Sequence, residues 1–357
     1  MKNIFRIFAV VVVLSAVMSQ SAYAGNDERR GTAGASELLI NPWARNTGWG
    51  GVNIACVRGL DAMFSNVAGL AFVENIEVGY SNTMLYGGKN GLSSGASINT
   101  FGLGIRIFDR GVAGVYVMAM GFGDIDVTTY LSPDAGSNGT FSPSYMNINV
   151  AYAHSFTTTI HGAVNFKVVT ESTDNISGSG FGIDAGIQYV TGEDDELKFG
   201  ISLKNWGPSM KFGGTGMSLQ MVNTAGNNFT VETRAAEMEL PTCLNIGLSY
   251  DFLFDKWDQR LTVAAAFTSN AFLRDNYTLG LEYSLLKMFQ LRCGYIFQPG
   301  MWTGDAATAN NGICAGASVD VPLTKKESDN IGLTLDYSYQ SATPLRGTHS
   351  IGASFRF

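Results

Sequence analysis

Residues 331–340 read IGLTLDYSYQ, and this stretch decides the fold class. Every second residue is apolar or aromatic, and the residues between them carry no side chain or a hydroxyl, carboxyl or amide group. Successive side chains of a β-strand point to opposite faces of a sheet, so this alternation predicts a strand with one apolar and one polar face. The apolar positions are Ile331, Leu333, Leu335, Tyr337 and Tyr339.

The same alternation recurs from residue 74 to the C-terminus. An even number of strands of about ten residues, each with one apolar side, is typical of outer-membrane β-barrels. The fourteen predicted strands are 74–82, 96–107, 111–122, 144–155, 160–171, 180–190, 196–206, 242–252, 259–269, 275–285, 289–298, 311–321, 329–341 and 346–357. Ionisable side chains fall on the non-apolar face: Asp184, Lys198, Lys204, Asp251, Glu282, Arg292, Asp320, Asp336 and Arg356.

A soluble β-sandwich would alternate in the same way, so the connections must separate the two folds. In a barrel whose N-terminus is periplasmic, odd-numbered connections are extracellular and long, and even-numbered ones are short. The odd connections here are 83–95, 123–143, 172–179, 207–241, 270–274, 299–310 and 342–345. The even ones are 108–110, 156–159, 191–195, 253–258, 286–288 and 322–328. A sandwich has no reason to sort loop lengths by parity, so we expect a 14-stranded antiparallel transmembrane β-barrel over 74–357.

The N-terminus has the features of a secretory signal. Lys2 and Arg6 precede an apolar run over residues 7–17, which ends before Ala22-Tyr23-Ala24. This is a charged region, an apolar region and an A-x-A cleavage site, so we expect residues 1–24 to be removed. The run is too short to cross the roughly 30 Å bilayer core as a helix. Export places the mature chain in the outer membrane of a Gram-negative bacterium, with lipid around it.

Composition agrees with a barrel and excludes several functions. Charged residues make up 15% of the chain, against about 25% in soluble domains. The net charge of −7 argues against nucleic acid, which is bound by clustered Lys and Arg. With four cysteines, the sequence allows one disulfide, either Cys56–Cys243 or Cys56–Cys314. The alternative is that all four are free thiols. Cys293 and Cys314 lie on opposite faces of their strands and cannot pair.

Residues 25–73 do not alternate and carry two short motifs. Ala44-Arg45 is followed by Gly48, Gly50 and Gly51, and residues 66–71 read NVAGLA. Here the chain resembles the PorV/PorQ family of Bacteroidota, which have the long-chain fatty-acid-transporter fold and are tied to type IX secretion. The resemblance implies that 25–73 form a lumenal hatch, with Arg45, Gly48, Gly50, Gly51, Asn66, Gly69 and Leu70 serving its backbone geometry and packing. Val67 departs from the family, which usually has proline there.

No catalytic or metal-binding pattern is present in the sequence. The three histidines lack ligand spacing, and the glycines at 178, 180 and 182 precede a strand rather than a helix. We therefore expect no enzyme activity, no metal and no cofactor. Apolar side chains in two long connections suit contact with a partner. They are Met210, Phe212, Met217, Met221, Phe229, Met301 and Trp302; packing among themselves is the equal alternative.

Three functions follow as hypotheses. The resemblance implies an interaction protein that binds type IX secretion components or exported cargo through its extracellular loops. The alternative is an uptake channel for a hydrophobic ligand, as the broader fold performs, although the many inward charges disfavour an apolar conduit. A general porin is the third, and a lumen filled by 25–73 should conduct few ions.

Overall fold

A computed structural model of the chain describes residues 26–87, 96–134, 138–254, 258–303, 308–324, 331–343 and 345–357. The predicted signal segment lies outside the described residues. The strands are β1 Ile76–Met84, β2 Ser97–Phe108, β3 Gly111–Gly121, β4 Ile125–Asp126, β5 Thr140–Phe141, β6 Ser144–Ser155, β7 Ile160–Thr173, β8 Ile176–Thr191, β9 Leu197–Trp206, β10 Met210–Gly213, β11 Ser218–Val222, β12 Asn228–Glu232, β13 Glu237–Met238, β14 Cys243–Phe254, β15 Gln259–Asn270, β16 Asn276–Leu285, β17 Phe289–Phe297, β18 Gly312–Pro322, β19 Gly332–Gln340 and β20 Thr348–Arg356.

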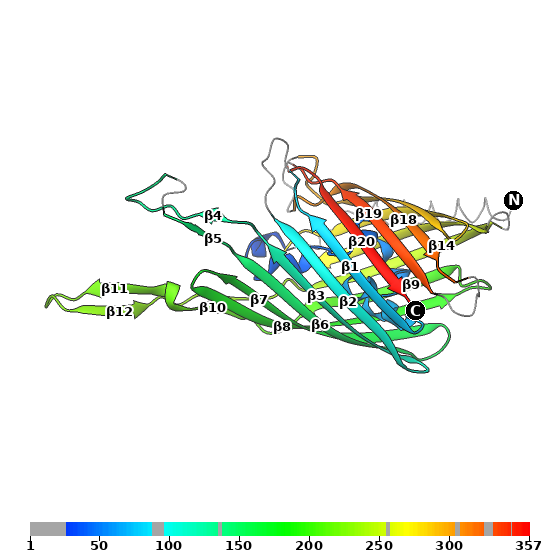
Figure 1. The fold of residues 1–357 in the computed structure, drawn as a ribbon, viewed down its shortest axis with the longest axis horizontal. Coiled ribbons are helices and arrows are strands. Elements are labelled where there is room, and N and C mark those ends of the chain that lie inside the picture. The colour runs from blue at the N-terminus through cyan, green and yellow to red at the C-terminus, as the bar shows by residue number, and fades with distance from the viewer. Residues whose placement is uncertain are drawn as a thin grey trace.

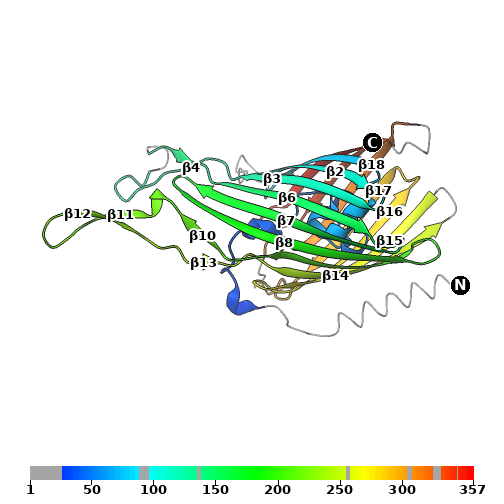
Figure 2. The same ribbon diagram turned by 90° about the horizontal axis from the view of Figure 1, so that it is seen from below.

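Fourteen long antiparallel strands close into one barrel, at the fourteen positions that alternation predicted. Neighbours in the chain pair in order, and β8 pairs with β9 across a bulge between Ile183 and Ala185. The ring closes where β1 pairs with β20, from Glu77–Arg356 to Met84–His349. A closed sheet has no unpaired edge, which is the requirement for a sheet in lipid. Figures 1 and 2 show the strands inclined to the long axis of the barrel.

The side chains of these strands follow the predicted two faces. On β19, Leu335 and Tyr337 are about half exposed on the outside, whereas Asp336 and Ser338 are buried inside. All nine predicted inward charges face the interior. Phe252 is an exception to the expected outward set, because it is buried at the end of β14 with its ring 4.7 Å from that of Tyr250. Apolar faces that point outward exclude the stacked-sheet alternative, in which they would face each other.

Connections differ in length between the two ends of the barrel. One end of the barrel has short turns and contains the C-terminus, and we call it the short-turn end. We call the opposite end the long-loop end (Figure 1). The connection predicted at 172–179 is only a turn at Asp174 and Asn175, since β7 and β8 are longer than predicted. The predicted loop 207–241 contains β10 to β13, and the β11–β12 hairpin projects far beyond the barrel (Figure 2).

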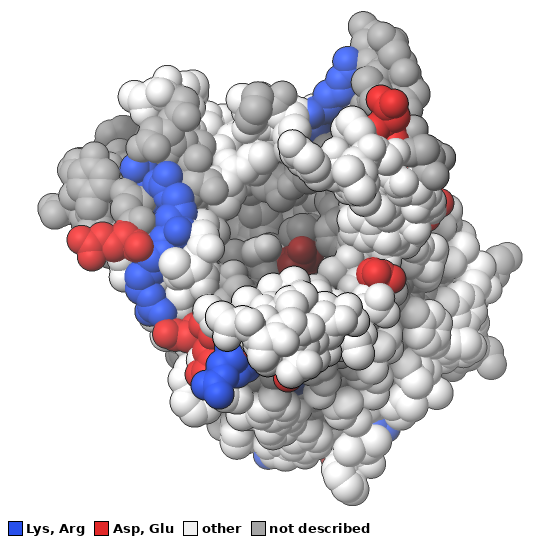
Figure 3. All heavy atoms as spheres, turned by 90° about the vertical axis from the view of Figure 1, so that its left-hand side faces the viewer, with Lys and Arg blue, Asp and Glu red and all other residues white. Residues whose placement is uncertain are grey.

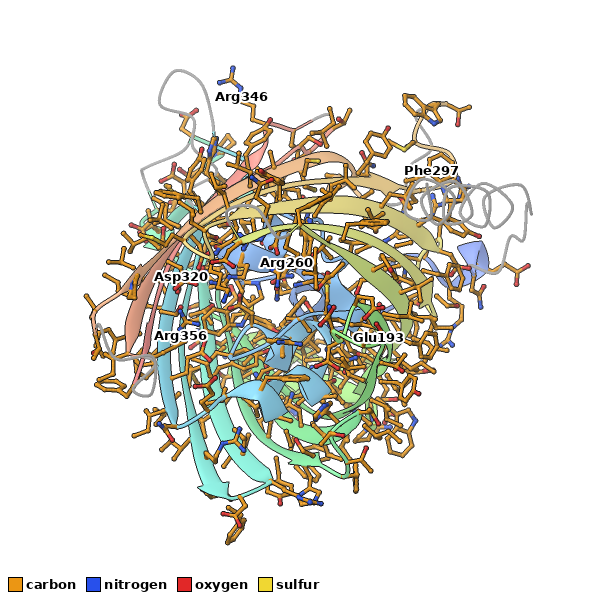
Figure 4. The ribbon with its side chains drawn as sticks, turned by 90° about the vertical axis from the view of Figure 1, so that its right-hand side faces the viewer. Glu193, Arg260, Phe297, Asp320, Arg346 and Arg356 are labelled. Atoms are coloured by element: carbon orange, nitrogen blue, oxygen red, sulfur yellow. The ribbon has the colours of Figure 1, made fainter. Side chains whose placement is uncertain are left out.

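The N-terminal segment, residues 26–73, consists of short helical turns that enter the barrel. No helix in the described part of the chain has the length and apolar character needed to cross a membrane. The turns are η1 Asp27–Arg29, η2 Ser36–Leu39, α2 Ala44–Thr47, η3 Asn53–Ala55, α3 Ala62–Ser65 and η4 Val67–Phe72. From residue 35 onward most of these side chains are buried, and the turns from α2 onward lie inside the ring of strands (Figure 4).

Inward-facing glycines make room for this segment. A Cβ added at any of them would lie within 3.3 Å of an atom of residues 43–73, so a side chain there would require a neighbouring atom to move. We call them the glycine belt: Gly79, Gly102, Gly104, Gly114, Gly186, Gly200, Gly247, Gly280, Gly294, Gly316 and Gly352. Several pair across neighbouring strands, such as Gly200 with Gly247 and Gly280 with Gly294. The belt therefore holds the segment at one level inside the barrel.

Candidate functional site

One side of the interior, formed by β2, β3, β6 and β7, carries a cluster of apolar side chains beside the buried polar residues Thr100, Asn147, Asn149, Asn165 and Lys167. The apolar side chains make one hydrophobic cluster with Leu38, Trp43, Leu60, Met63 and Leu70 of the N-terminal segment. We call these strand residues the apolar wall: Ile98, Val112, Tyr116, Met118, Met120, Tyr145, Ala151, Ala153, Ala163 and Val169. Because β3 carries the wall from Val112 near the short-turn end to Met120 near the long-loop end, the apolar surface runs along the length of the barrel.

The opposite side of the interior is a network of ion pairs across β9 and β14 to β20. Lys198 Nζ lies 2.5 Å from Asp251 Oδ2, and Arg292 Nε lies 2.6 Å from Glu282 Oε2. Arg356 pairs with Asp320. Buried charges are stable only when paired or hydrogen-bonded, so these contacts explain how so many ionisable residues face inward.

A further buried pair joins the predicted inward residue Asp184 to Lys167, which was not identified from the sequence. Lys167 on β7 lies 2.7 Å from Asp184 on β8, and its Nζ also donates to Asn205 Oδ1 at 2.7 Å. Lys167 alternates with apolar outward residues, as the predicted inward charges do. That alternation was the signal that could have identified it.

A cavity of about 820 Å³ opens at the short-turn end, between the N-terminal segment and the charged wall of strands. Its lining includes Arg45, Cys56 and Arg58 from the segment and Arg260 and Glu282 from β15 and β16. Figure 4 looks into this end, with Arg260 at the edge of the central opening and Asp320 and Arg356 on the neighbouring wall. The volume is in the range of small-molecule sites, roughly 300–1,000 Å³.

Arg45 joins the N-terminal segment to the charged side of the barrel. Its Nε lies 3.3 Å from Asp336 Oδ1 on β19 and 3.7 Å from Asp61 Oδ2 in the segment itself. Burial acts to lower the pKa of Arg45, but Asp336 and Asp61 outweigh burial and raise it. Burial also raises the pKa of Asp61 to about 7, against the opposing effect of Arg45. The role of Arg45 is therefore electrostatic anchoring as well as packing.

The other residues of the predicted hatch motif have close-packing roles. Gly50 and Gly51 have positive φ angles of 64° and 72°, which favour glycine, and Gly48 lies against Gly316. Asn66 Nδ2 donates to the carbonyls of Ile54 (2.9 Å) and Ile187 (3.1 Å). A Cβ on Gly69 would lie 2.2 Å from the Val57 carbonyl oxygen. Leu70 is fully buried in the apolar cluster.

The predicted partner-contact residues do not form one surface. Met210 is buried, and a Cβ on Gly34 would lie 2.9 Å from its sulfur; Phe212 is partly buried against the same cluster. These two residues of β10 therefore pack inside, rather than standing on an exposed loop as expected. Met217 is half-buried beside the β11–β12 hairpin, on which Met221 and Phe229 are exposed. Met301 is half-buried and Trp302 is exposed in a separate connection.

The exposed hairpin has one apolar face. Leu219 pairs with Val231 and Met221 with Phe229, so these four side chains share a face. Figure 3 looks at the long-loop end and shows a hollow in the middle of that face of the molecule. The hairpin projects beyond the barrel at this end (Figure 1).

All four cysteines are free in the structure. Cys243 and Cys314 are buried and Cys293 is exposed on the outside, which agrees with the opposite faces predicted for Cys293 and Cys314. The structure therefore shows neither of the two disulfides left open by the sequence. Among the described residues, no group of three or more His, Cys, Asp or Glu is placed to hold a metal ion.

No protein-family model and no curated protein matches this chain. Solved structures of similar shape include a TodX deltaS2S3 mutant monoaromatic hydrocarbon channel, with 14% identity and a TM-score of 0.56 over 89% of this chain and 98% of that one. A Pseudomonas aeruginosa FadL homologue has 12% identity and a TM-score of 0.54 over 89% and 99%. The CymD monoaromatic hydrocarbon channel has 14% identity and a TM-score of 0.54 over 89% and 98%. The chain therefore has the fold of FadL-type outer-membrane barrels.

Proposed function

We propose that this protein is a non-enzymatic outer-membrane channel for hydrophobic small molecules, with residues 26–73 as its hatch. The observation that carries the proposal is the apolar wall, which runs along the barrel and is covered by the N-terminal segment together with Met210 and Leu240. The barrel similarity to two monoaromatic hydrocarbon channels supports the same substrate class at the level of fold. The long-loop end would face the outside of the cell.

Passage requires movement of the segment. Trp43, Leu60, Met63 and Leu70 occupy the apolar side of the lumen, and the glycine belt holds them close to the strands. A hydrophobic solute would replace these side chains against the apolar wall, while the ion pairs on the other side would disfavour it. The same packing argues against a general porin, for which we expect little ion conductance in planar bilayers.

Uptake of a radiolabelled monoaromatic hydrocarbon by Gram-negative cells expressing the chain tests the proposal. The Met120→Glu variant places a carboxylate on the apolar wall, and we expect it to reduce uptake at least about tenfold. Leu219→Glu, on the projecting hairpin, is the matched control and should leave uptake unchanged. Equal uptake by cells with and without the protein would refute a channel.

A second candidate is a role in type IX secretion, as the PorV/PorQ resemblance implies, by binding secretion components or exported cargo. The exposed apolar face of the β11–β12 hairpin favours it, since monomeric proteins rarely expose such a face without a partner. Removing residues 218–232 should impair surface display of cargo while the barrel still assembles. Unchanged display would count against this role, and Bacteroidota would be the natural setting for the test.

A further inference from the structure

The cavity at the short-turn end has more positive than negative charge. Its lining contains seven basic residues, Arg45, Arg58, Lys198, Arg260, Lys287, Arg292 and Arg356, and three acidic ones, Asp251, Glu282 and Asp320. Two further carboxylates, Asp61 and Asp336, lie behind Arg45 and pair with it. Even with these two, the basic residues outnumber the acidic ones by seven to five.

The surplus is shared by Lys287, which is exposed, and by Arg58 and Arg260. Glu282 forms ion pairs with two guanidinium groups: Arg260 Nη2 lies 2.7 Å from one of its oxygens, and Arg292 Nε lies 2.6 Å from the other. Within the described chain no carboxylate is at ion-pair distance from Arg58, which instead stacks 4.5 Å from the centre of the Phe72 ring. The Nε of Arg260 is buried and has no hydrogen-bond partner there.

Arg58 and Arg260 come from different parts of the chain and face the same space. Arg58 lies in the N-terminal segment and Arg260 near the start of β15, and both line the cavity. Burial lowers the pKa of Arg58, and the largest effect of any neighbouring charge on it comes from Arg260. Among the described residues, the only carboxylate at ion-pair distance from either guanidinium group is that of Glu282, which Arg260 shares with Arg292. Arg58 and Arg260 therefore have N–H donors left for an external anion.

We propose that this cavity binds a small organic anion whose carboxylate or phosphate group lies between Arg58 and Arg260. The guanidinium groups supply forked donors that match either oxyanion. Trp49, Val57 and Met288 line the same cavity and provide apolar contact for the rest of the ligand. The site is separate from the apolar wall and does not depend on the channel function proposed above.

Calorimetric titration of the full chain in nanodiscs tests the site with three probes: benzoate, benzyl alcohol and inorganic phosphate. Benzyl alcohol has the ring of benzoate without its charge, and we expect it to bind at least about tenfold more weakly than benzoate. Arg58→Gln should weaken benzoate binding at least about tenfold, and Arg58→Lys should weaken it less because the charge is kept. Arg110→Gln, in an exposed turn outside the cavity lining, is the matched control and should have no effect.

Folding of each variant is checked by the heat-dependent shift of the barrel in gel electrophoresis. If inorganic phosphate competes with benzoate, the site accepts phosphate esters as well as carboxylates. If it does not compete, the site accepts carboxylates. Either result supports an oxyanion site. Equal binding of benzoate and benzyl alcohol, or unchanged benzoate binding by a folded Arg58→Gln variant, would overturn the proposal. Hydrocarbon uptake by Arg58→Gln should stay normal, so the two proposals can fail separately.

Discussion

The side-chain oxygen of Asn66 lies beside the β8 backbone in the space that a side chain at Gly186 would fill. A Cβ added to Gly186 would lie 2.1 Å from Asn66 Oδ1. The same oxygen accepts from the Ala68 amide at 3.2 Å, and the Nδ2 group donates to the Ile187 carbonyl on β8. One motif asparagine and one belt glycine thus fix the N-terminal segment to the barrel.

We expect Gly186→Ala to destabilise the docked segment by about 1–3 kcal/mol, because the new methyl group must displace Asn66. Gly121→Ala is the control, since a Cβ there would have no atom within 4 Å. Urea unfolding of both variants in micelles gives the free energies. Identical midpoints for the two would show that the contact has no energetic importance.

The buried Lys167–Asp184 pair should be far more important than an exposed one. Asp184 accepts from Lys167 Nζ, from Asn165 Nδ2 at 2.8 Å and from the Asn205 amide at 2.7 Å. Asp184→Asn leaves a buried ammonium without its carboxylate and should cost about 3–5 kcal/mol of unfolding free energy.

The exposed Arg29–Glu239 pair is the control for this measurement, with side chains 40% and 58% exposed. Glu239→Gln should change stability by less than about 1 kcal/mol. The double variant Lys167→Met with Asp184→Asn should lose less than Asp184→Asn alone, because no unpaired charge is left. A greater loss in the double variant would contradict the electrostatic explanation.

Asp61 makes the stability depend on pH. Its pKa is about 7 in the docked segment, against an ordinary value of 3.8, chiefly because of burial. The raised pKa means that the folded state favours the protonated carboxyl, so this stabilisation is complete below about pH 4 and is lost as pH rises through 7. Between pH 5 and 8 we expect a loss of about 2–3 kcal/mol in the wild type.

Asp61→Asn cannot ionise and should lack this loss. Urea midpoints at pH 5 and pH 8 for the two proteins provide the measurement. If both proteins show the same dependence on pH, another group titrates and the assignment to Asp61 is wrong.

Cys56 should react slowly although it lines the cavity. Burial, followed by the charge of Glu282, raises its pKa to about 12. Since the thiolate is the reactive form, the rate of alkylation by iodoacetamide should keep rising about tenfold per pH unit between pH 8 and 10. The measurement uses a variant with Cys243, Cys293 and Cys314 replaced by alanine. A rate that levels off near pH 9 would indicate an ordinary thiol.

Much of the barrel could be predicted because one repeated rule, apolar outward and polar inward, governs most strands, although β2 and β3 also carry apolar residues on the inward face. It placed Asp184, Glu282 and Asp336 inside without knowledge of any neighbour. The partners of these charges could not be predicted, because they depend on register between strands. Lys167 and Asp184, for example, lie on β7 and β8, whose register is fixed by a two-residue turn that was taken for a longer loop.

The loop 207–241 was the weakest part of the prediction for a physical reason. Met210 was expected at an exposed rim, yet β10 pairs with an extended β8 and its apolar residues turn into the lumen. Short strands of four residues carry too little alternation to be distinguished from loop.

The glycine belt was visible as inward glycines, but its purpose depends on the path of the N-terminal segment, which no local pattern gives.

Movement of the N-terminal segment is the central requirement, and a disulfide lock tests it most directly. A Cβ on Gly352 would lie 3.2 Å from the Ala44 Cβ, close to the spacing of roughly 3.5–4.5 Å in disulfides. Ala44→Cys with Gly352→Cys, in a background without the four native cysteines, would tie the segment to β20. Hydrocarbon uptake should be lost on oxidation and return with a reductant. Uptake that is equal in the oxidised and reduced states would contradict a movable hatch.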